Sequence, residues 1–215
     1  MPPPGGADYL GTVPSPSQRA RPSDATRPPR VIARVLAGGL GARLGRDKSR
    51  VRLGRRTLTG WALAAARAAG LPARALRRDA VARCGPLGGI LTALQSTRAD
   101  AVLILACDMP FVPPALLRRL LRALRPGTAA VMMVSDARLG FPLLLRREPC
   151  LPVVARQIER GTYSLQALGE ALGARRLRPA DRDAAALWNV NTPEELRAAR
   201  EKIRPARLAK PRRAG

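Results

Sequence analysis

The chain has 215 residues, a formal net charge of +24, no histidine, three cysteines and few aromatic side chains. The absence of histidine excludes histidine-dependent catalytic triads and histidine metal sites, and three cysteines without CxxC spacing argue against a disulfide framework or a structural zinc site. The basic residues are spread over the whole chain and lack the aromatic platforms of single-strand binders, so we do not expect nucleic acid as the main partner, whereas a positive field also attracts polyphosphate substrates.

The two ends of the chain differ in composition from its middle. Residues 1–30 are rich in Pro, Ser and Arg and are expected to be disordered, and residues 204–215 form a basic, Pro-containing tail. Residues 31–203 have the length and apolar content of one domain. No segment offers the roughly 18 uncharged residues of a membrane span, and the N-terminus lacks the apolar region of a secretory signal. We therefore expect a cytoplasmic protein with no membrane partner, and the sequence sets no oligomeric state.

Strand-like and helix-like runs alternate along residues 31–203, which predicts βαβ units and a largely parallel sheet. In chain order, the predicted elements are a strand at 31–37, a helix at 59–69, a helix including 89–95, a buried strand at 101–106, a helix opened by Pro113 and Pro114, a strand at 129–134, a short helix capped by Ser164, a strand-like segment at 185–190 and a helix that a capping box at Thr192 opens and that ends near Ile203.

A glycine-rich loop, LAGGLGARLGRDK at residues 36–48, follows the first predicted strand. Glycines let backbone N–H groups approach phosphate oxygens, and Arg43 and Lys48 can neutralise charge on the β- and γ-phosphates. The loop is not a Walker loop, because Asp47 precedes Lys48, and Leu44 stands where a dinucleotide fingerprint needs its third glycine. Lys48 is one of only three lysines. Since arginine does not replace its compact charge, a phosphate site is favoured over a merely flexible turn.

The motif CDMPF at residues 107–111 directly follows the predicted buried strand. In open α/β sheets, ligands bind beyond the carboxyl ends of the strands. Asp108 therefore stands where a carboxylate can hold Mg²⁺ against triphosphate oxygens. The alternative is that Asp108 caps the next helix, but that helix begins several residues later, at Pro113 and Pro114. The sequence therefore predicts a Mg²⁺ ligand at Asp108.

Two weaker motifs accompany the glycine loop and Asp108. The turn GPLGGI at 85–90 leads into a helix and suits the lining of a base or ribose, although glycine and proline pairs are also ordinary turn signals. Asn189 and Asn191 are the only asparagines of the chain, and alternation places both side chains on one face of an extended segment. Turn and cap chemistry explains Thr192 and Pro193, and the asparagines remain candidate contacts to ligand or metal.

In this order and spacing, the four motifs resemble the molybdenum cofactor guanylyltransferase family over residues 31–203, whereas the glycine loop alone is shared with the wider nucleotidyltransferase superfamily. The resemblance implies a three-layer, Rossmann-like nucleotidyltransferase fold with a mostly parallel sheet. It implies that the chain transfers GMP from GTP to the phosphate of molybdopterin (the molybdenum cofactor), releasing pyrophosphate, with Mg²⁺ as cofactor. The segment GFPL at 140–143 also resembles the one that the family uses near its acceptor site.

The resemblance further implies the roles of individual residues. The family binds GTP with the backbone after its first strand, with the loop lysine and with an aspartate before the GPLGGI turn, for which Asp79 is the best match. We expect nucleotide contacts from Leu36, Ala37, Gly38, Gly39, Lys48, Asp79 and Asp108. Catalytic roles are expected for Lys48, Arg43 and Asp108, metal binding for Asp108, and substrate contacts for Asn189 and Asn191.

The sequence departs from the family between the first predicted helix and Gly85. The family has there a second strand, with an asparagine that helps to read the guanine, but residues 73–78 are too short and too rich in arginine for a good buried strand. We expect that strand to be shortened or missing. The alternatives are therefore a relative that uses CTP or a sugar-phosphate-type acceptor, a non-catalytic nucleotide-binding module, and a nucleic-acid binder.

Overall fold

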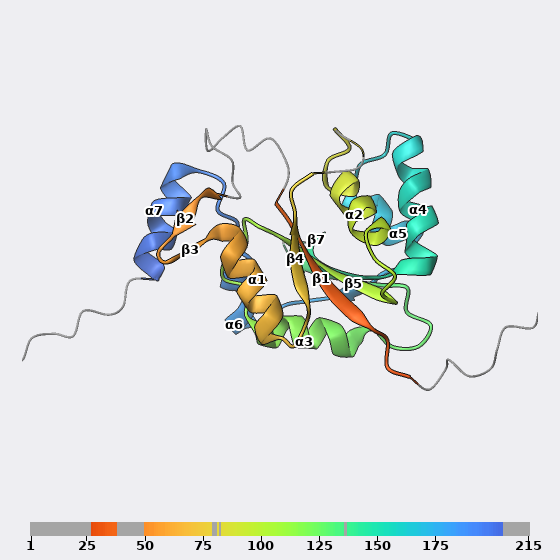
Figure 1. Cartoon of the computed structure of the whole chain (residues 1–215), viewed down its shortest axis with the longest axis horizontal. Coiled ribbons are helices and arrows are strands. Elements are labelled where there is room, and N and C mark those ends of the chain that lie inside the picture. The colour runs from red at the N-terminus through yellow and green to blue at the C-terminus, as the bar shows by residue number, and fades with distance from the viewer. Residues whose placement is uncertain (1–26, 38–49, 79–80, 82, 136, 204–215) are drawn as a thin grey trace, which may run out of the picture.

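The computed structural model describes residues 27–37, 50–78, 81, 83–135 and 137–203. These residues form a central sheet with helices on both faces, and a small hairpin and the last helix lie together at one end (Figure 1). Most of the glycine-rich loop, residues 38–49, lies outside the described residues, as do Asp79 and most of both predicted terminal extensions.

The central sheet has the strand order β4-β1-β5-β7-β6-β8. Its pairings are parallel except those of β7, which runs antiparallel to both β5 and β6. The strands are β1 (Val31–Leu36), β4 (Ala73–Leu76), β5 (Ala101–Ala106), β6 (Ala130–Ser135), β7 (Arg138–Arg146) and β8 (Arg175–Leu177). The predicted mostly parallel sheet is confirmed, and β5 has the continuous apolar sequence of a strand buried on both faces.

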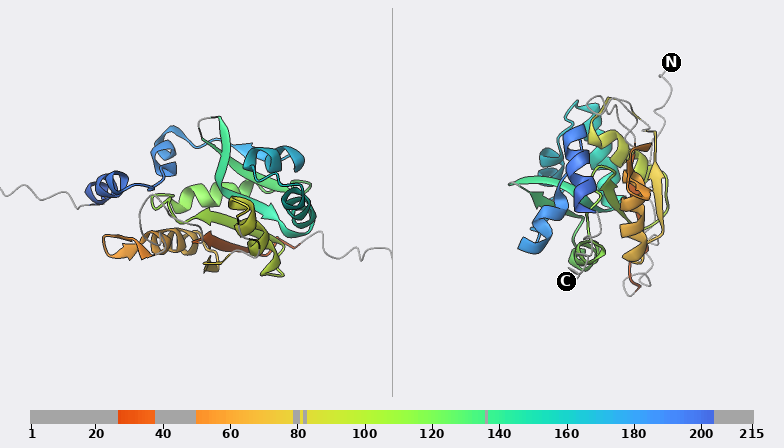
Figure 2. Two further views of the ribbon diagram at one scale, coloured as in Figure 1. Left: turned by 90° about the horizontal axis from the view of Figure 1, so that it is seen from above. Right: turned by 90° about the vertical axis from the view of Figure 1, so that its left-hand side faces the viewer.

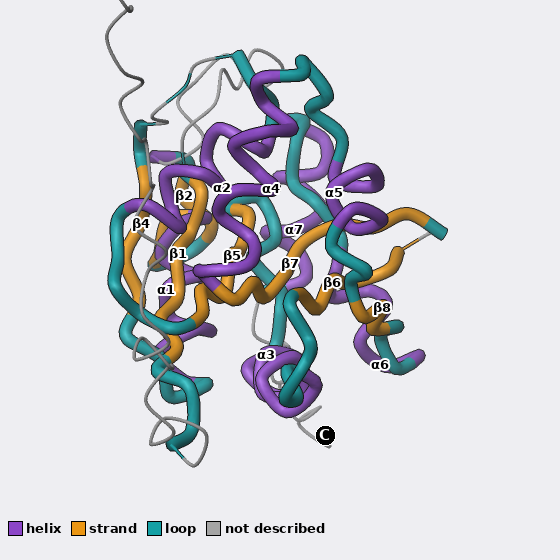
Figure 3. Tube along the Cα trace, turned by 90° about the vertical axis from the view of Figure 1, so that its right-hand side faces the viewer, coloured by secondary structure: helices purple, strands orange, loops and turns teal. Residues whose placement is uncertain are grey.

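Helices cover both faces of this sheet. Figure 3 shows the strands in a row, with α2, α4 and α5 on one side and α3 on the other. Alternate residues of β1 divide between the two cores, because Ala33 and Val35 pack with α1 and α3 whereas Ile32 packs with α2. The three-layer fold is thus confirmed. The helices are α1 (Leu58–Ala68), α2 (Pro86–Gln95), α3 (Pro114–Ala123), α4 (Arg147–Glu159) and α5 (Leu165–Ala171).

A small lobe stands apart from the three layers (Figures 1 and 2). This hairpin lobe consists of the strands β2 (Arg52–Leu53) and β3 (Arg56–Thr57) and the helix α7 (Pro193–Lys202). Leu53 and Ala199 are buried together in it. The lobe is joined to the rest of the molecule because Val190 and Leu58 belong to the same hydrophobic cluster.

The sequence signals for helix ends are confirmed. Gly70, just after α1, has φ +91°, and the hydroxyl of Ser164 caps α5 by accepting from the amides of residues 166 and 167. Pro113 and Pro114 are the N-cap and first residue of α3. Thr192 and Glu195 form the complete capping box of α7. None of the helices in the described ranges has the length and apolar character needed to cross a membrane.

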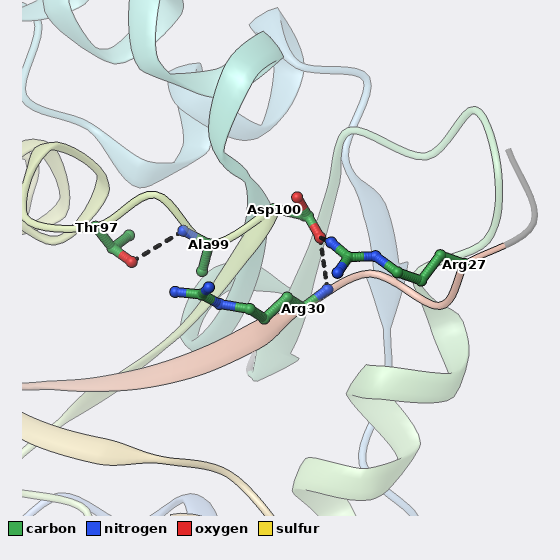
Figure 4. A network of polar contacts seen from close by, with 5 residues as sticks. All are labelled: Arg27, Arg30, Thr97, Ala99 and Asp100. Carbon is green, nitrogen blue, oxygen red and sulfur yellow. Dashed lines mark hydrogen bonds and ion pairs between the residues drawn. The ribbon is translucent and has the colours of Figure 1, made fainter. Parts of the chain in front are cut away.

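The starts of β1 and β5 are fastened to one another by Asp100 (Figure 4). Its Oδ2 atom accepts a hydrogen bond from the Arg30 backbone N–H at 2.6 Å and a longer contact of 3.5 Å from the guanidinium of Arg27. The ion pair is exposed to solvent and adds little stability, whereas the backbone bond fixes the entry of the chain into β1. This contact lies at the amino ends of the strands, opposite to the edge where β1 and β5 end.

The second strand of the sheet, expected to be shortened or missing, is present but short. The strand β4 spans four residues and pairs in parallel with β1, with Leu76 opposite Leu36. Its position explains how an arginine is tolerated there: β4 is an edge strand, so Arg74 reaches solvent while Ala73 is buried against the core.

The expectation of a strand at 185–190 is wrong. Residues 181–187 form the short helix α6 (Asp181–Ala184) and the 3₁₀ turn η3 (Ala185–Leu187), and the extended residues 188–190 join no ladder of the sheet. A run of three alanines fits a helical turn better than a strand, because alanine has the highest helix propensity. Sequence reasoning also missed β7 and α4, both of which carry internal prolines that read as breaks.

Candidate active site

The carboxyl ends of β1 and β5 lie side by side. Leu36 stands opposite Ala106 in the register of the two parallel strands, and the Cys107 N–H donates to the Leu36 carbonyl at 3.2 Å. On the other side, the Ala37 N–H donates to the Leu76 carbonyl at 2.8 Å. The backbone at the start of the glycine-rich loop and the loop that carries Asp108 therefore leave the sheet at the same edge, as the sequence predicts.

Asp108 is held as part of this edge rather than as a helix cap. Its side chain is half-buried, with the Oδ1 atom shielded from solvent. The helix α3 has Pro113 as its N-cap and no side-chain capping bond, so the capping alternative for Asp108 is excluded. The Asp108 carbonyl accepts a hydrogen bond of 2.8 Å from the Val190 N–H.

That hydrogen bond brings residues 189–191, here called the asparagine segment, next to the Asp108 loop. Asn189 is exposed and Asn191 is half-buried, on either side of the fully buried Val190. The Glu195 carboxylate accepts hydrogen bonds from the backbone N–H groups of Asn191 and Thr192 at 2.5 and 2.9 Å. The capping box of α7 therefore fixes the backbone of the asparagine segment next to Asp108, even though this segment is not part of the sheet.

An aromatic pair reinforces this junction and was missed by sequence reasoning. The rings of Phe111 and Trp188 are stacked with centroids 5.9 Å apart and an angle of 1° between their planes. The ammonium of Lys202 lies 4.8 Å from the Phe111 centroid. Phe111 is the last residue of the CDMPF motif, and Trp188 directly precedes Asn189. In a chain with so few aromatic residues, these positions beside two motifs were the sequence signal for the pair.

The GPLGGI turn opens α2, as predicted. Gly85 has φ +53°, a conformation that glycine adopts without strain, and Pro86 is the first helical residue. Tyr163 from the loop before α5 lies against the turn, because a Cβ at Gly85 would be 3.7 Å from its Cβ. The pKa of Tyr163 is raised, mainly by the electrostatic influence of Cys84 and secondly by a hydrogen bond between the side chains of Tyr163 and Cys84.

The GFPL segment lies in β7. Because β7 is antiparallel to β5, it enters the sheet at the edge where β5 ends, with Leu143 opposite Ile104 and Gly140 opposite Met133. The segment therefore lies toward the same edge of the sheet as Asp108, the edge where β1 and β5 end. The predicted residues Gly38, Gly39, Arg43, Lys48 and Asp79 lie outside the described residues.

Among the described residues, Asp108 is not part of a larger cluster of metal-binding side chains. No group of three or more Asp, Glu, Cys or His side chains able to hold a metal occurs in the described ranges. Many nucleotide sites hold Mg²⁺ with one or two carboxylates, water and substrate phosphates, so such a cluster is not a requirement for binding this metal.

Comparison with known proteins identifies relatives with this architecture. The family model of the MobA-like NTP transferase domain matches residues 73–181. A probable molybdenum cofactor guanylyltransferase from Opitutus terrae is 34% identical over 185 residues, which cover 75% of this chain and 90% of the relative. The molybdenum cofactor guanylyltransferase from Desulfosudis oleivorans is 28% identical over 130 residues, covering 58% of this chain and 64% of the relative.

Solved structures share the fold. Molybdopterin-guanine dinucleotide biosynthesis protein A from Archaeoglobus fulgidus has a TM-score of 0.66 and 24% identity, covering 79% of this chain and 97% of that one. The 2-C-methyl-D-erythritol 4-phosphate cytidylyltransferase from Thermus thermophilus has a TM-score of 0.63 and 20% identity, covering 82% and 100%. Rv0371c from Mycobacterium tuberculosis, solved in complex with manganese, has a TM-score of 0.54 and 19% identity, covering 81% and 100%. Because the family model matches half of the chain and a relative is 34% identical over 90% of its length, the chain belongs to the MobA-like NTP transferase family.

Proposed function

We propose that this chain transfers GMP from GTP to the phosphate of molybdopterin and releases pyrophosphate. The observation that carries the proposal is the junction of three segments at one sheet edge: the backbone at Ala37, the carboxylate of Asp108 and the segment around Val190. The 34% identity to a probable molybdenum cofactor guanylyltransferase supports the choice of nucleotide and acceptor. We propose GTP and molybdopterin as the substrates of this chain and the cytoplasm as its compartment.

The chemistry requires positioning and charge neutralisation rather than a covalent intermediate. A phosphate oxygen of molybdopterin attacks the α-phosphorus of GTP in line, a new phosphoanhydride bond forms, and the bond from the α-phosphorus to the bridging oxygen breaks. Both electrons of that bond leave with pyrophosphate. Because the attacking oxygen is already anionic, no general base is needed, which is compatible with a chain that has no histidine.

The proposal assigns roles to the residues at this edge. The backbone of Leu36, Ala37, Gly38 and Gly39 would bind the nucleotide, together with Asp79. Lys48 and Arg43 would stabilise the negative charge that builds on the pyrophosphate leaving group. Asn189 and Asn191 would contact the substrate. This assignment is supported by the hydrogen bond that fixes the intervening Val190 to the Asp108 backbone.

Mg²⁺ is the metal proposed for this site, with Asp108 as its protein ligand. A carboxylate oxygen is the hard donor that Mg²⁺ prefers, and one or two carboxylates with substrate phosphates and water complete such sites. When bound, Mg²⁺ supplies Lewis-acid stabilisation of phosphate charge. The half-buried position of Asp108 keeps its Oδ1 atom shielded while the side chain still reaches the edge where substrate would bind.

The decisive experiment offers the purified full chain the possible substrates side by side. Molybdopterin, Mg²⁺ and either GTP or CTP are incubated with the protein, and pyrophosphate and dinucleotide are measured. We expect a guanine dinucleotide with GTP and little product with CTP. A cytosine dinucleotide would move the proposal to the CTP-using relatives, and product only with a sugar phosphate would replace the acceptor. Binding of GTP–Mg²⁺ without pyrophosphate release for any acceptor would overturn catalysis altogether.

A further inference from the structure

We propose that the hairpin lobe carries a second anion site, which binds a phosphorylated compound with a flat ring, in the chemical class of nucleotides. The site is a pocket of about 800 Å³ between the hairpin and the end of α7, here called the hairpin pocket. Its described lining residues are Arg52, Gly54, Arg55, Arg56, Trp61, Arg200 and Ile203. None of them belongs to the candidate active site described above.

The charge of the hairpin pocket points to an anion. Four of its described lining residues are arginines and none is acidic. Within the described part of the chain none of these arginines forms an ion pair; the salt bridges found there involve Arg27, Arg119 and Arg197. Like charges gathered around one cavity repel each other, and a multivalent anion between them removes that repulsion. Guanidinium groups match phosphate oxygens with paired hydrogen bonds, so a phosphate group suits this set.

A tryptophan gives the pocket a flat apolar wall. The Trp61 indole N–H donates to the Leu53 carbonyl at 2.9 Å, which fixes the orientation of the ring. The guanidinium of Arg56 lies over this ring, 5.3 Å from its centroid. Aromatic rings and guanidinium planes are the surfaces on which nucleobases stack. The ligand that uses both parts of the lining carries a flat ring as well as phosphate.

The shape of the pocket is set by a glycine. Gly54 has φ +61°, and a Cβ there would stand 2.6 Å from the Cδ1 atom of Ile203. The hairpin turn and the end of α7 therefore meet at Gly54, where a larger residue would require the end of the Ile203 side chain to move. A volume of about 800 Å³ falls within the roughly 300–1,000 Å³ of small-molecule sites, which favours a nucleotide-sized ligand over a polymer.

Equilibrium dialysis of the full chain with labelled GTP, at constant ionic strength, tests the proposal. We expect two GTP molecules per chain with Mg²⁺ present. The double variant Arg55→Gln/Arg200→Gln should weaken one of them at least about tenfold, because each removed guanidinium takes away charge-assisted hydrogen bonds. The matched control Arg156→Gln/Arg160→Gln removes the same charge from the exposed face of α4 and should change neither site more than about twofold.

A fluorescence measurement locates the second site independently. In a Trp188→Phe background, Trp61 is the only tryptophan of the chain. We expect GTP to change its emission in the chain with both arginines and not in the Arg55→Gln/Arg200→Gln variant. If pyrophosphate displaces GTP from this site, the phosphate chain, which the GTP substrate carries, is the part recognised. If only di(guanosine-5′) diphosphate displaces GTP, the site recognises a dinucleotide, the class of the proposed product.

The proposal does not rest on the function proposed for the Asp108 site, because binding is measured without molybdopterin and repeated in Asp108→Asn. It is overturned if GTP binding is the same in the Arg55→Gln/Arg200→Gln variant as in the unchanged chain, if the two arginine double variants show equal losses, or if neither variant affects the Trp61 signal. An acidic peptide that displaces GTP as effectively as pyrophosphate would also overturn it, because any anion would then bind and phosphate would not be recognised.

Discussion

The stacked pair of Phe111 and Trp188 gives a measurable prediction about the metal site proposed at Asp108. The contacts that hold the Asp108 loop to residues 188–191 include the hydrogen bond from the Val190 N–H to the Asp108 carbonyl and the ring stack at 5.9 Å. Trp188→Leu removes the stack but keeps an apolar side chain. Without the stack, the fraction of molecules with Asp108 in its metal-binding position should fall, and the apparent affinity for Mg²⁺ should fall by the same factor.

The stacking energy sets the size of this effect. Parallel aromatic pairs contribute about 0.5–1.5 kcal/mol beyond area burial, which corresponds to a roughly two- to tenfold change in an equilibrium constant. We therefore expect the Mg²⁺ concentration for half-maximal pyrophosphate release to rise about two- to tenfold in Trp188→Leu, at saturating GTP. Trp188→Phe keeps a ring in place and serves as the control, with a change below about twofold.

A loss of rate at every Mg²⁺ concentration, with an unchanged half-saturation point, would refute this reasoning. It would show that the stack supports the fold of the lobe without positioning Asp108. The same conclusion would follow if the leucine and phenylalanine variants of Trp188 behaved alike. Thermal unfolding of both variants, measured beside the kinetics, separates loss of folded protein from loss of metal affinity.

The remaining predictions concern catalysis, the hairpin and a buried thiol. Asp108→Asn and Lys48→Ala should each lower the rate of pyrophosphate release by about 10²–10³, and near-normal turnover would remove these residues from the proposed chemistry. Gly54→Ala and Gly70→Ala both place alanine at positive φ and should each cost about 1–2 kcal/mol in urea denaturation. A Cβ at Gly54 also meets the terminal methyl of Ile203 at 2.6 Å, whereas nothing lies within 4 Å at Gly70. Because that methyl can turn aside at a cost of about 0.5–1.5 kcal/mol, the extra loss at Gly54 should stay in this range, and a much larger excess would contradict this reasoning. Burial raises the pKa of Cys150 from 9.0 to about 12, so the unfolded chain releases this proton first and the contribution of Cys150 to the free energy of unfolding should fall as pH rises from about 9 to 12. Alkylation of native Cys150 at pH 9 should accordingly be much slower than in urea, and equal rates would show that the thiol is accessible.

Local sequence signals predicted the strands and helices that have a continuous apolar run or a clear cap. The continuous apolar run of β5, the Gly70 stop after α1 and the capping box at Thr192 each specify their structure through nearby backbone chemistry. Such signals depend on propensity, capping and periodicity, which act within a few residues and can be read without knowing the fold. They also predicted that Asp108 follows the carboxyl end of the buried strand β5, the end of the strands beyond which ligands bind in open α/β sheets.

Other features depended on neighbours far away in the sequence. The strand β4 contains Arg74 and still forms, because it is at the sheet edge and pairs with β1 on one side only. The segment around Val190 does not form the predicted strand, yet it reaches the site through a bond to the Asp108 backbone. Neither outcome follows from propensity, because each is decided by which long-range partner is within hydrogen-bonding distance.

By itself, the sequence determined the α/β class of this protein, the position of its Asp108 loop and the resemblance carried by its motifs, since these are properties of residue order and short-range patterning. Only the tertiary structure decided that Phe111 stacks on Trp188 and that Gly54 lies against Ile203 to leave a pocket lined by arginines. The physical reason is that packing between residues more than 70 positions apart depends on where the whole chain places them, and no local preference encodes that placement.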